Sequence, residues 1–303
     1  MQTWLCLSGG NALGAFHAGA WGAIEAASLK VTRISGASIG AILAALIAGS
    51  PPGRRVERLD AFLDELAQTP MPGIGRRGLV AGTMLLGQPA LFAPSMPGLA
   101  EILPGMPPDN AVFHRRATRR LLLRHVDFDR LNGGEIEVTV TATDAQTGEA
   151  RAFRNTDAPL TVDHLLASSA LPVLFPPVTI DARSFFDAGL AENLPLRPLL
   201  DRGDDALILA CDLYNPTGTL RPTMDGIADR AQELAFGCQT RHLLASLDTE
   251  GRRLRHIVLS DPDDDFAGKA FDYTRASLRR RAMLGQRLMA EALAQPIPAG
   301  GPD

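Results

Sequence analysis

The sequence is poor in cysteine, carries little net charge and contains no long apolar run, and each shortage argues against a class of protein. The three cysteines, Cys6, Cys211 and Cys238, are too scattered for metal ligands, which favours reduced core thiols. A formal net charge of −4 over 303 residues gives no electrostatic reason to expect nucleic-acid binding. No uninterrupted apolar run reaches the roughly 18 residues of a membrane-spanning helix, and no basic segment with an apolar core opens the chain. We therefore expect a soluble cytoplasmic protein.

The most informative stretch is residues 36–40, Gly-Ala-Ser-Ile-Gly, which places Ser38 between two glycines. The β-branched run before it predicts a short buried strand over 31–35, and the alanine-rich run after it predicts a helix over 39–49. The two glycines permit a sharp turn that projects the serine hydroxyl from a helix N-terminus, as in a nucleophile elbow. Taken alone, the pentapeptide is equally compatible with a simple packing turn.

A second strand, loop and helix opens the chain. An apolar N-terminal strand leads into a loop of small residues, 8–14, and then into a predicted helix over 15–27. Such a loop offers backbone N–H groups to an anion, either a phosphate or the oxyanion of an acyl-transfer intermediate. The dinucleotide fingerprint needs glycine where this chain has Asn11, and the P-loop needs a Gly-Lys-Ser/Thr that does not follow. An oxyanion hole is the better interpretation, with candidate donors Gly9, Gly10 and Asn11.

A third candidate segment lies far downstream, where a strand predicted over 178–186 leads into Asp187. An aspartate at a strand end, followed by small residues, is the type of group that orients or deprotonates a serine. Just upstream, residues 166–178 predict a helix that breaks at Pro172 and continues into an apolar run.

The six histidines do not predict a Ser-His-Asp triad. His17 precedes the serine, whereas the histidine of an α/β-hydrolase triad follows the acid. His242 lies in a long helical pattern and His256 starts a strand, so neither has the expected loop context. The remaining three lack partners at ligand-like spacing, which argues against a metal site: His114, His125 and His164.

Four motifs follow one another along the chain, and together they resemble a known family. They are L-S-G-G-N-A-L-G (7–14), G-A-S-I-G (36–40), A-S-S-A-L-P-V-L-F-P-P-V (167–178) and F-D-A-G-L-A-E-N-L-P (186–195). In order and spacing this succession resembles the patatin-like phospholipases, over residues 5–214. The resemblance implies a three-layer α/β fold with a mainly parallel central sheet flanked by helices.

The resemblance also implies a Ser-Asp dyad hydrolase that needs no histidine, metal or other cofactor. Ser38 would be the nucleophile and Asp187 its base. The oxyanion hole of the family maps onto Gly9, Gly10 and Asn11. The supporting positions of the motifs are Gly14, Gly36, Ile39, Gly40, Ala188 and Gly189.

This chain departs from the family pattern at Asn11 and Ala188, where glycine is usual. Asparagine tolerates a positive φ better than most residues, and its side chain would either crowd the acyl carbonyl or add a donor. Ala188 would restrict the turn after Asp187 if that turn needs a positive φ. Loss of one oxyanion donor costs about a hundredfold to a thousandfold in rate.

The resemblance implies a patatin-like catalytic domain over 1–220 and a mainly helical extension over 221–303, packed on the same domain. Segment 69–109 is apolar but broken by proline and glycine. A lid or acyl-chain contact is as compatible with it as an ordinary loop with short helices. Two arginine-rich patches, 115–120 and 279–281, are expected to be solvated helix faces, with attraction to anionic headgroups the minority interpretation.

The first functional hypothesis is a serine hydrolase of lipid-like acyl esters, acting through an acyl-enzyme, with a lipid or fatty-acyl ester as its partner. An acyltransferase that uses the same intermediate is the alternative enzyme. A weakly active lipid-binding protein is the third hypothesis, motivated by Asn11 and Ala188. Transient contact with a membrane surface would accompany such substrates.

Overall fold

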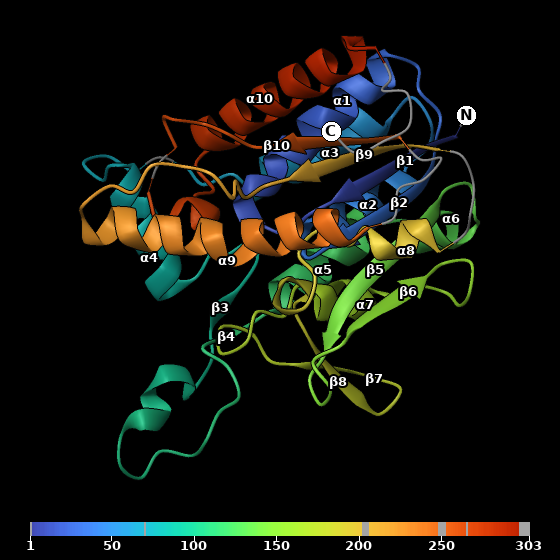
Figure 1. Cartoon of the computed structure of the whole chain (residues 1–303). Helices are drawn as coiled ribbons and strands as arrows, with labels where there is room; N and C mark the ends of the chain where they lie inside the picture. The colour runs from blue at the N-terminus through green and yellow to red at the C-terminus, as the bar shows by residue number, and fades with distance from the viewer. Residues whose placement is uncertain (1, 70, 202–205, 248–252, 265, 297–303) are drawn as a thin grey trace.

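An eight-stranded sheet runs through the centre of the structure (Figure 1). The structure is a computed structural model that describes residues 2–69, 71–201, 206–247, 253–264 and 266–296. The strands of the sheet are β1 (Gln2–Leu7), β2 (Val31–Ala37), β5 (Glu137–Asp144), β6 (Ala150–Arg154), β7 (Val178–Ile180), β8 (Arg183–Phe186), β9 (Ala206–Asp212) and β10 (Arg253–Val258). Their order is β10-β9-β1-β2-β5-β8-β7, with β6 paired to β5.

Most of this sheet is parallel. Strands β10, β9, β1, β2 and β5 run in one direction, whereas β6, β7 and β8 pair antiparallel. This arrangement confirms the predicted α/β class. The prediction of one strand over 178–186 is wrong, because β7 and β8 form a hairpin. The turn residues of this hairpin, Asp181 and Ala182, have positive φ values of 47° and 61°. Hairpin turns of this kind are usually predicted from glycine or asparagine, and neither occurs here.

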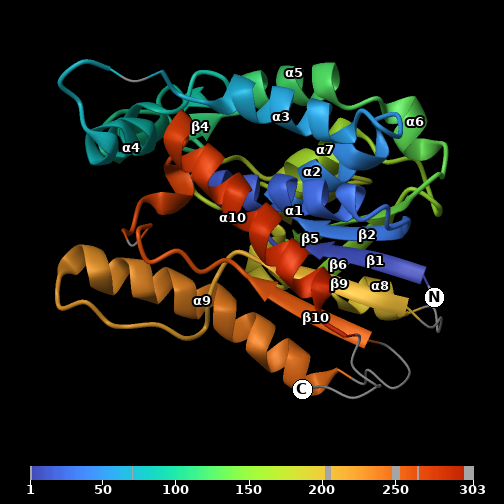
Figure 2. The same cartoon turned by 90° about the horizontal axis from the view of Figure 1, so that it is seen from above.

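Helices cover both faces of the sheet (Figure 2). They are α1 (Ala15–Ala26), α2 (Ile39–Ala48), α3 (Arg55–Leu66), α4 (Arg76–Leu86), α5 (Arg116–His125), α6 (Phe128–Asn132), α7 (Val162–Ser168), α8 (Arg197–Leu200), α9 (Met224–Ser246) and α10 (Arg275–Ala294). Short 3-10 turns are η1 (Asn11–Gly14), η2 (Gly98–Ile102), η3 (Ala188–Leu190) and η4 (Lys269–Phe271). Among these described segments, none is a helix both long and apolar enough to cross a membrane.

The side chains of β1 show how two cores form on one sheet. Successive residues of a strand point to opposite faces. Leu5 and Leu7 join the large core that includes α1 and α2, whereas Trp4 and Cys6 join a smaller core with α8 and α9. The sheet is therefore the middle of three layers.

Helix α10 lies directly against α1 (Figure 2). The contact depends on glycine in both helices. A Cβ atom added to Gly19 would collide with the Ala282 carbonyl, and one added to Gly285 would collide with the Phe16 carbonyl. The two backbones approach so closely that only glycine fits at the crossing.

Segment 69–109 contains more regular structure than its proline and glycine content predicts. It holds α4, the short strand β3 (Ala93–Pro94), which pairs with β4 (Phe113–His114), and η2. The stretch that joins β3 to β4 projects away from the body of the molecule (Figure 1).

Candidate active site

Ser38 occupies a sharp turn between β2 and α2. Its φ and ψ are 53° and −120°, in a region that costs energy for any residue with a side chain. A Cβ atom added to Gly36 would lie 2.5 Å from the Gly40 carbonyl carbon, and one added to Gly40 would collide with the Leu7 carbonyl. The turn can close only because both positions are glycine.

The Ser38 hydroxyl donates a hydrogen bond to Oδ2 of Asp187, at 2.8 Å. The two residues are 149 positions apart, and both are buried. Strand β5 joins them through the sheet, because it pairs with β2 on one side and with β8, which ends just before Asp187, on the other. The fold thus brings together the two residues that the motifs predicted for the dyad.

Hydrogen bonds fix Asp187 in this position. Its Oδ1 accepts from the Gly189 N–H at 2.8 Å. Its own N–H donates to the Ala170 carbonyl at 2.9 Å, and its carbonyl accepts from the Thr143 hydroxyl at 2.8 Å. A Cβ atom on Gly189 would lie 3.1 Å from Asp187 Oδ1, so glycine suits this position. Ala188 is buried in η3 without a positive φ, so the turn needs no glycine there.

Burial raises the pKa of Asp187 to about 6. Loss of water around the carboxylate is the main cause. The hydrogen bonds from Gly189 and Ser38 act in the opposite direction, as does the positive charge of Arg115. The carboxylate is therefore mostly ionised at neutral pH, yet basic enough to accept a proton from an adjacent hydroxyl.

The glycine-rich loop lies next to this pair. The Gly9 N–H already donates to the Asn193 carbonyl at 3.1 Å, and the Asn193 side-chain amide donates back to the Gly9 carbonyl at 3.3 Å. A Cβ atom on Gly9 would lie 3.1 Å from the Ser38 Cβ, so the loop must be small here. Asn11 has a φ of 50°, which asparagine tolerates, and it opens η1.

In the part of the chain that the structure describes, the N–H groups of Gly10, Asn11 and Ala12 have no hydrogen-bond acceptor, and the first two lie nearest to the start of the loop. The first N–H groups of a helical turn are free in this way. Gly14 closes the loop, and a Cβ atom there would collide with the side chain of Ile39, the residue after the serine. The loop and the serine turn therefore pack directly against each other.

An apolar cavity opens beside Ser38, with about 50 Å3 of free space. Its polar lining comes from Asn11, Ser38, Arg115, Thr118 and Ser169. The apolar lining comes from Ile39, Ile42, Phe62, Leu66, Leu91, Phe92, Leu121, Leu122 and Phe175, with the ring of Tyr273.

Arg115 corrects the prediction of a solvated face for 115–120, because its side chain is buried in the wall of this cavity. It donates to the Ser169 carbonyl at 2.8 Å and to the Leu166 carbonyl at 2.6 Å, and so caps the end of α7. Burial lowers its pKa to about 10, so it stays cationic at neutral pH. The same end of α7 supplies the Ser168 hydroxyl, which accepts from the Ser38 N–H at 2.9 Å.

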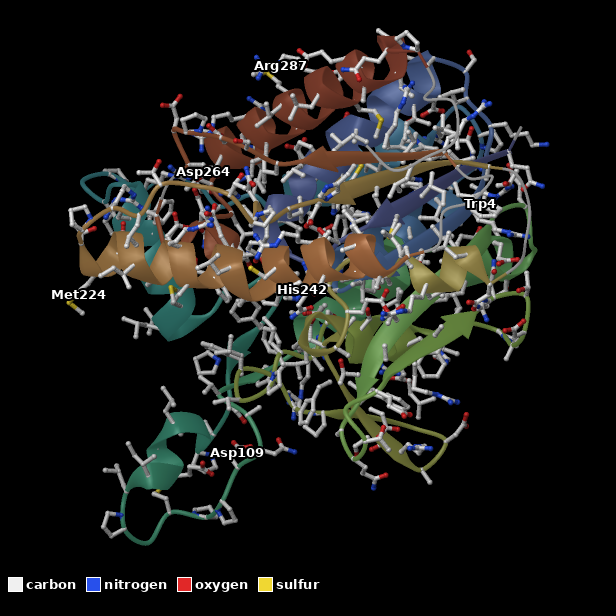
Figure 3. The ribbon with its side chains drawn as sticks, viewed as in Figure 1. Trp4, Asp109, Met224, His242, Asp264 and Arg287 are labelled. Atoms are coloured by element: carbon white, nitrogen blue, oxygen red, sulfur yellow. The ribbon has the colours of Figure 1, made fainter. Side chains whose placement is uncertain are left out.

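Arg281 is a second exception to the predicted solvated faces, because it is fully buried. Its guanidinium donates to the Asp264 carboxylate at 2.8 Å (Asp264 is labelled in Figure 3) and to the Ala12 carbonyl at 3.2 Å. Ala12 belongs to η1, so a residue of α10 holds the turn that follows the glycine loop. The signal that could have found them is helical spacing: Arg281 lies three residues after Leu278 and eight before Met289 on the buried face of α10, and Arg115 lies seven residues before Leu122 of α5.

No histidine hydrogen-bonds to Ser38 or Asp187 among the described residues. His17 Nε2 lies 3.0 Å from the carbonyl oxygen of Ser8, the residue before the two glycines of the loop. Burial lowers the pKa of His17 to about 4, so its imidazole is neutral at pH 7. Across the same residues, no group of three or more His, Cys, Asp or Glu could hold a metal ion.

A family model for patatin-like phospholipase matches residues 5–200 of this 303-residue chain. The chain therefore belongs to the patatin-like phospholipase family, which confirms the resemblance seen in its motifs. No curated protein matches the sequence.

Two solved structures are similar to this chain at low sequence identity, and the first of them shows the same fold. The crystal structure of VipD from Legionella pneumophila has a TM-score of 0.50 and 15% identity, with 96% of this chain and 66% of that chain covered. A structure of the heterodimeric ExoU–SpcU complex from the type III secretion system of Pseudomonas aeruginosa has a TM-score of 0.42 and 19% identity, with 96% and 51% covered. This chain thus spans between half and two thirds of the chains that it matches.

Proposed function

We propose that this protein hydrolyses lipid-like acyl esters with a Ser38–Asp187 dyad. The observation that carries the proposal is the 2.8 Å hydrogen bond from the Ser38 hydroxyl to a buried carboxylate, at a strained turn on the wall of an apolar cavity. Membership of the patatin-like phospholipase family supports the same activity. An apolar lining suits an acyl chain, because little of it can hydrogen-bond to a polar substrate.

The reaction has two halves. Asp187 accepts the hydroxyl proton while Ser38 Oγ attacks the ester carbonyl carbon, which forms a tetrahedral oxyanion. As the carbon–oxygen bond to the leaving group breaks, protonated Asp187 returns that proton to the departing alkoxide, and Ser38 is left acylated. A water molecule then gives a proton to Asp187 and attacks the acyl carbon. As the bond from that carbon to Ser38 Oγ breaks, protonated Asp187 returns the proton to Oγ, which releases the fatty acid and restores both the serine hydroxyl and the carboxylate.

The oxyanion would be held by backbone N–H groups of the glycine loop. Because the Gly9 N–H is already used by Asn193, we assign the donor role to Gly10 and Asn11, with Gly9 keeping the loop close to Ser38. The Ile39 N–H, in the first turn of α2, is a further candidate. An Asn11→Gly substitution would remove the asparagine side chain and keep the backbone N–H of residue 11 as a donor to the oxyanion.

We also propose how the chain is divided. Residues 1–220 would form the catalytic domain, and residues 221–303 would complete it through α10, whose Arg281 reaches η1. Segment 69–109 would act as a lid through Leu91 and Phe92, which line the narrow cavity and would move to admit a long acyl chain. The unpaired cysteines suit a reducing compartment such as the cytoplasm.

Fluorophosphonate labelling and p-nitrophenyl ester hydrolysis over a range of acyl lengths test the dyad. We expect Ser38→Ala to abolish labelling, and both Ser38→Ala and Asp187→Asn to lower kcat by about a thousandfold or more. Ser260→Ala and Asp129→Asn change exposed residues of the same types and are the matched controls. Turnover that survives Ser38→Ala would refute the proposal. Acyl transfer to an added alcohol in place of hydrolysis would indicate an acyltransferase, and lipid binding without turnover a lipid-binding protein.

A further inference from the structure

The segment between β3 and β4 exposes an unusual number of large aliphatic side chains. Its exposed residues are Met96, Leu99, Ile102, Leu103 and Met106, and we call residues 96–106 the apolar prong. Ile102 is 81% exposed and Met96 is 85% exposed. The prong extends from the body of the molecule, and Asp109 marks its base (Figures 1 and 3).

Polar contacts at the base hold the prong in this form. The Asp109 carboxylate accepts from the Ser95 hydroxyl at 2.7 Å and from the Gly98 N–H at 2.9 Å. The Ser95 N–H donates to the Val112 carbonyl at 2.8 Å, which continues the pairing of β3 with β4. The polar groups are thus satisfied at the base, while the aliphatic groups face outward. This is the reverse of the usual arrangement of a surface loop.

The base of the prong is continuous with the wall of the Ser38 cavity. Phe92, just before β3, lines that cavity, and its ring packs against Phe113 of β4 and against Phe175, with both pairs of ring centroids 5.1 Å apart. The Val112 N–H donates to the carbonyl of Val173, an exposed residue two positions before Phe175 of the cavity wall. The base of the prong is therefore joined directly to the wall of the Ser38 cavity.

The composition of the prong indicates what covers it. Protein interfaces are enriched in aromatic residues, methionine and arginine, and of these residues 96–106 contain only Met96 and Met106. No lysine or arginine occurs from residue 78 to residue 114, so the prong does not offer cations to phosphate groups. Its one charged side chain, Glu101, accepts from the Asp109 N–H at 2.6 Å. The exposed leucine, isoleucine and methionine side chains suit the acyl region of a lipid layer, where binding follows the apolar area buried.

We propose that the apolar prong inserts into the surface of a zwitterionic phospholipid layer and holds the Ser38 cavity against its substrate. This inference rests on the proposed function, because it assumes that the substrate comes from a lipid layer. Since insertion uses no positive charge, it does not require anionic lipid and changes little with salt.

Flotation with vesicles of pure phosphatidylcholine tests the proposal. Ile102→Asp combined with Leu103→Asp should lower the bound fraction about tenfold or more, because two aliphatic side chains that would enter the lipid layer become charged. Leu123→Asp combined with Met283→Asp is the matched control: both residues are exposed and apolar, and they lie on α5 and α10. Raising NaCl from about 0.1 M to about 0.5 M should change binding of the parent protein by less than about twofold.

Two substrates separate this proposal from the proposed function. Neither Ile102 nor Leu103 lines the Ser38 cavity. The prong variant should therefore hydrolyse p-nitrophenyl butyrate like the parent protein, with an unchanged Tm, and lose about tenfold or more against phosphatidylcholine vesicles. Equal vesicle binding by parent and prong variant would overturn the prong, while Ser38-dependent hydrolysis of the soluble ester would still support the dyad. Vesicle binding by a parent protein that hydrolyses neither ester would support the prong and refute the hydrolase. A dimer that the prong substitutions dissociate, without any effect on vesicles, would assign the surface to a second copy and overturn the proposal.

Discussion

The pH dependence of hydrolysis follows from the environment of Asp187. The proposed mechanism needs an ionised carboxylate, and the pKa of this group is about 6 in the folded protein. At pH 5 roughly one molecule in eleven carries the ionised base, so kcat/KM should lie about tenfold below its plateau. The value of kcat/KM should rise through pH 6 and level off at about pH 7.5.

The charge of Arg115 supplies a perturbation with a defined direction. Arg115 lowers the pKa of Asp187, so Arg115→Met should raise that pKa and move the rising limb of the profile to higher pH. Arg115→Lys keeps the charge and should leave the midpoint near that of the parent protein. Both variants should lower the plateau, because the three contacts of Arg115 with Leu166 and Ser169 hold the end of α7.

The assay is kcat/KM for p-nitrophenyl butyrate at constant ionic strength, read at the isosbestic wavelength of p-nitrophenol. A short soluble ester avoids any contribution from lipid binding. A midpoint near the ordinary aspartate value, or a flat profile, would refute the role of burial. An Arg115→Met profile that moves to lower pH, or that matches Arg115→Lys, would refute the electrostatic role of the arginine.

Three further predictions concern stability and positioning. Asp187→Asn should raise the free energy of unfolding at pH 8 by about 1–3 kcal/mol in urea titrations, because a raised folded-state pKa means that ionisation of Asp187 opposes folding. The gain should vanish below about pH 4, where the carboxyl is protonated in both states. An equal gain at both pH values would contradict this cause. Ser168→Ala leaves the buried Ser38 N–H without its acceptor, so fluorophosphonate labelling should slow about tenfold to a hundredfold, and an unchanged labelling rate would argue against this support. Gly285→Ala should destabilise the protein by about 1–3 kcal/mol, because the added Cβ collides with the Phe16 carbonyl. Gly22→Ala is the control: nothing lies within 4 Å of its added Cβ, so it should stabilise the protein slightly. Similar melting temperatures for the two variants would count against the close helix crossing.

Local patterns in the sequence were sufficient to place the serine turn and the glycine loop. Both motifs depend on glycine within a few residues of a strand end, so their geometry is encoded next to the residues concerned. The order of the motifs was sufficient to predict the family and the α/β class. The position of Asp187 beside Ser38 needed the family resemblance, since no local pattern joins residues so far apart.

Long-range contacts account for what the sequence could not predict. Arg115 and Arg281 lie in arginine-rich runs typical of solvated helices, and only the packing of distant segments buries them. The Gly9 N–H is occupied by Asn193, 184 residues away, which removes one of the three donors expected for the oxyanion. Within 69–109 each short element contains a residue that usually argues against regular structure: α4 contains Gly78 and Gly82, β3 contains Pro94 and η2 begins at Gly98, so composition alone could not give their bounds.

The contact between Arg281 and Ala12 has a consequence for how the protein is made. Ala12 is synthesised 269 residues before Arg281. Strand β9, which completes one side of β1, is also synthesised after both members of the proposed dyad. A nascent chain that already carries Ser38 and Asp187 thus lacks the Arg281 contact that supports the glycine loop. The order of synthesis delays assembly of the proposed catalytic centre until α10 has been made.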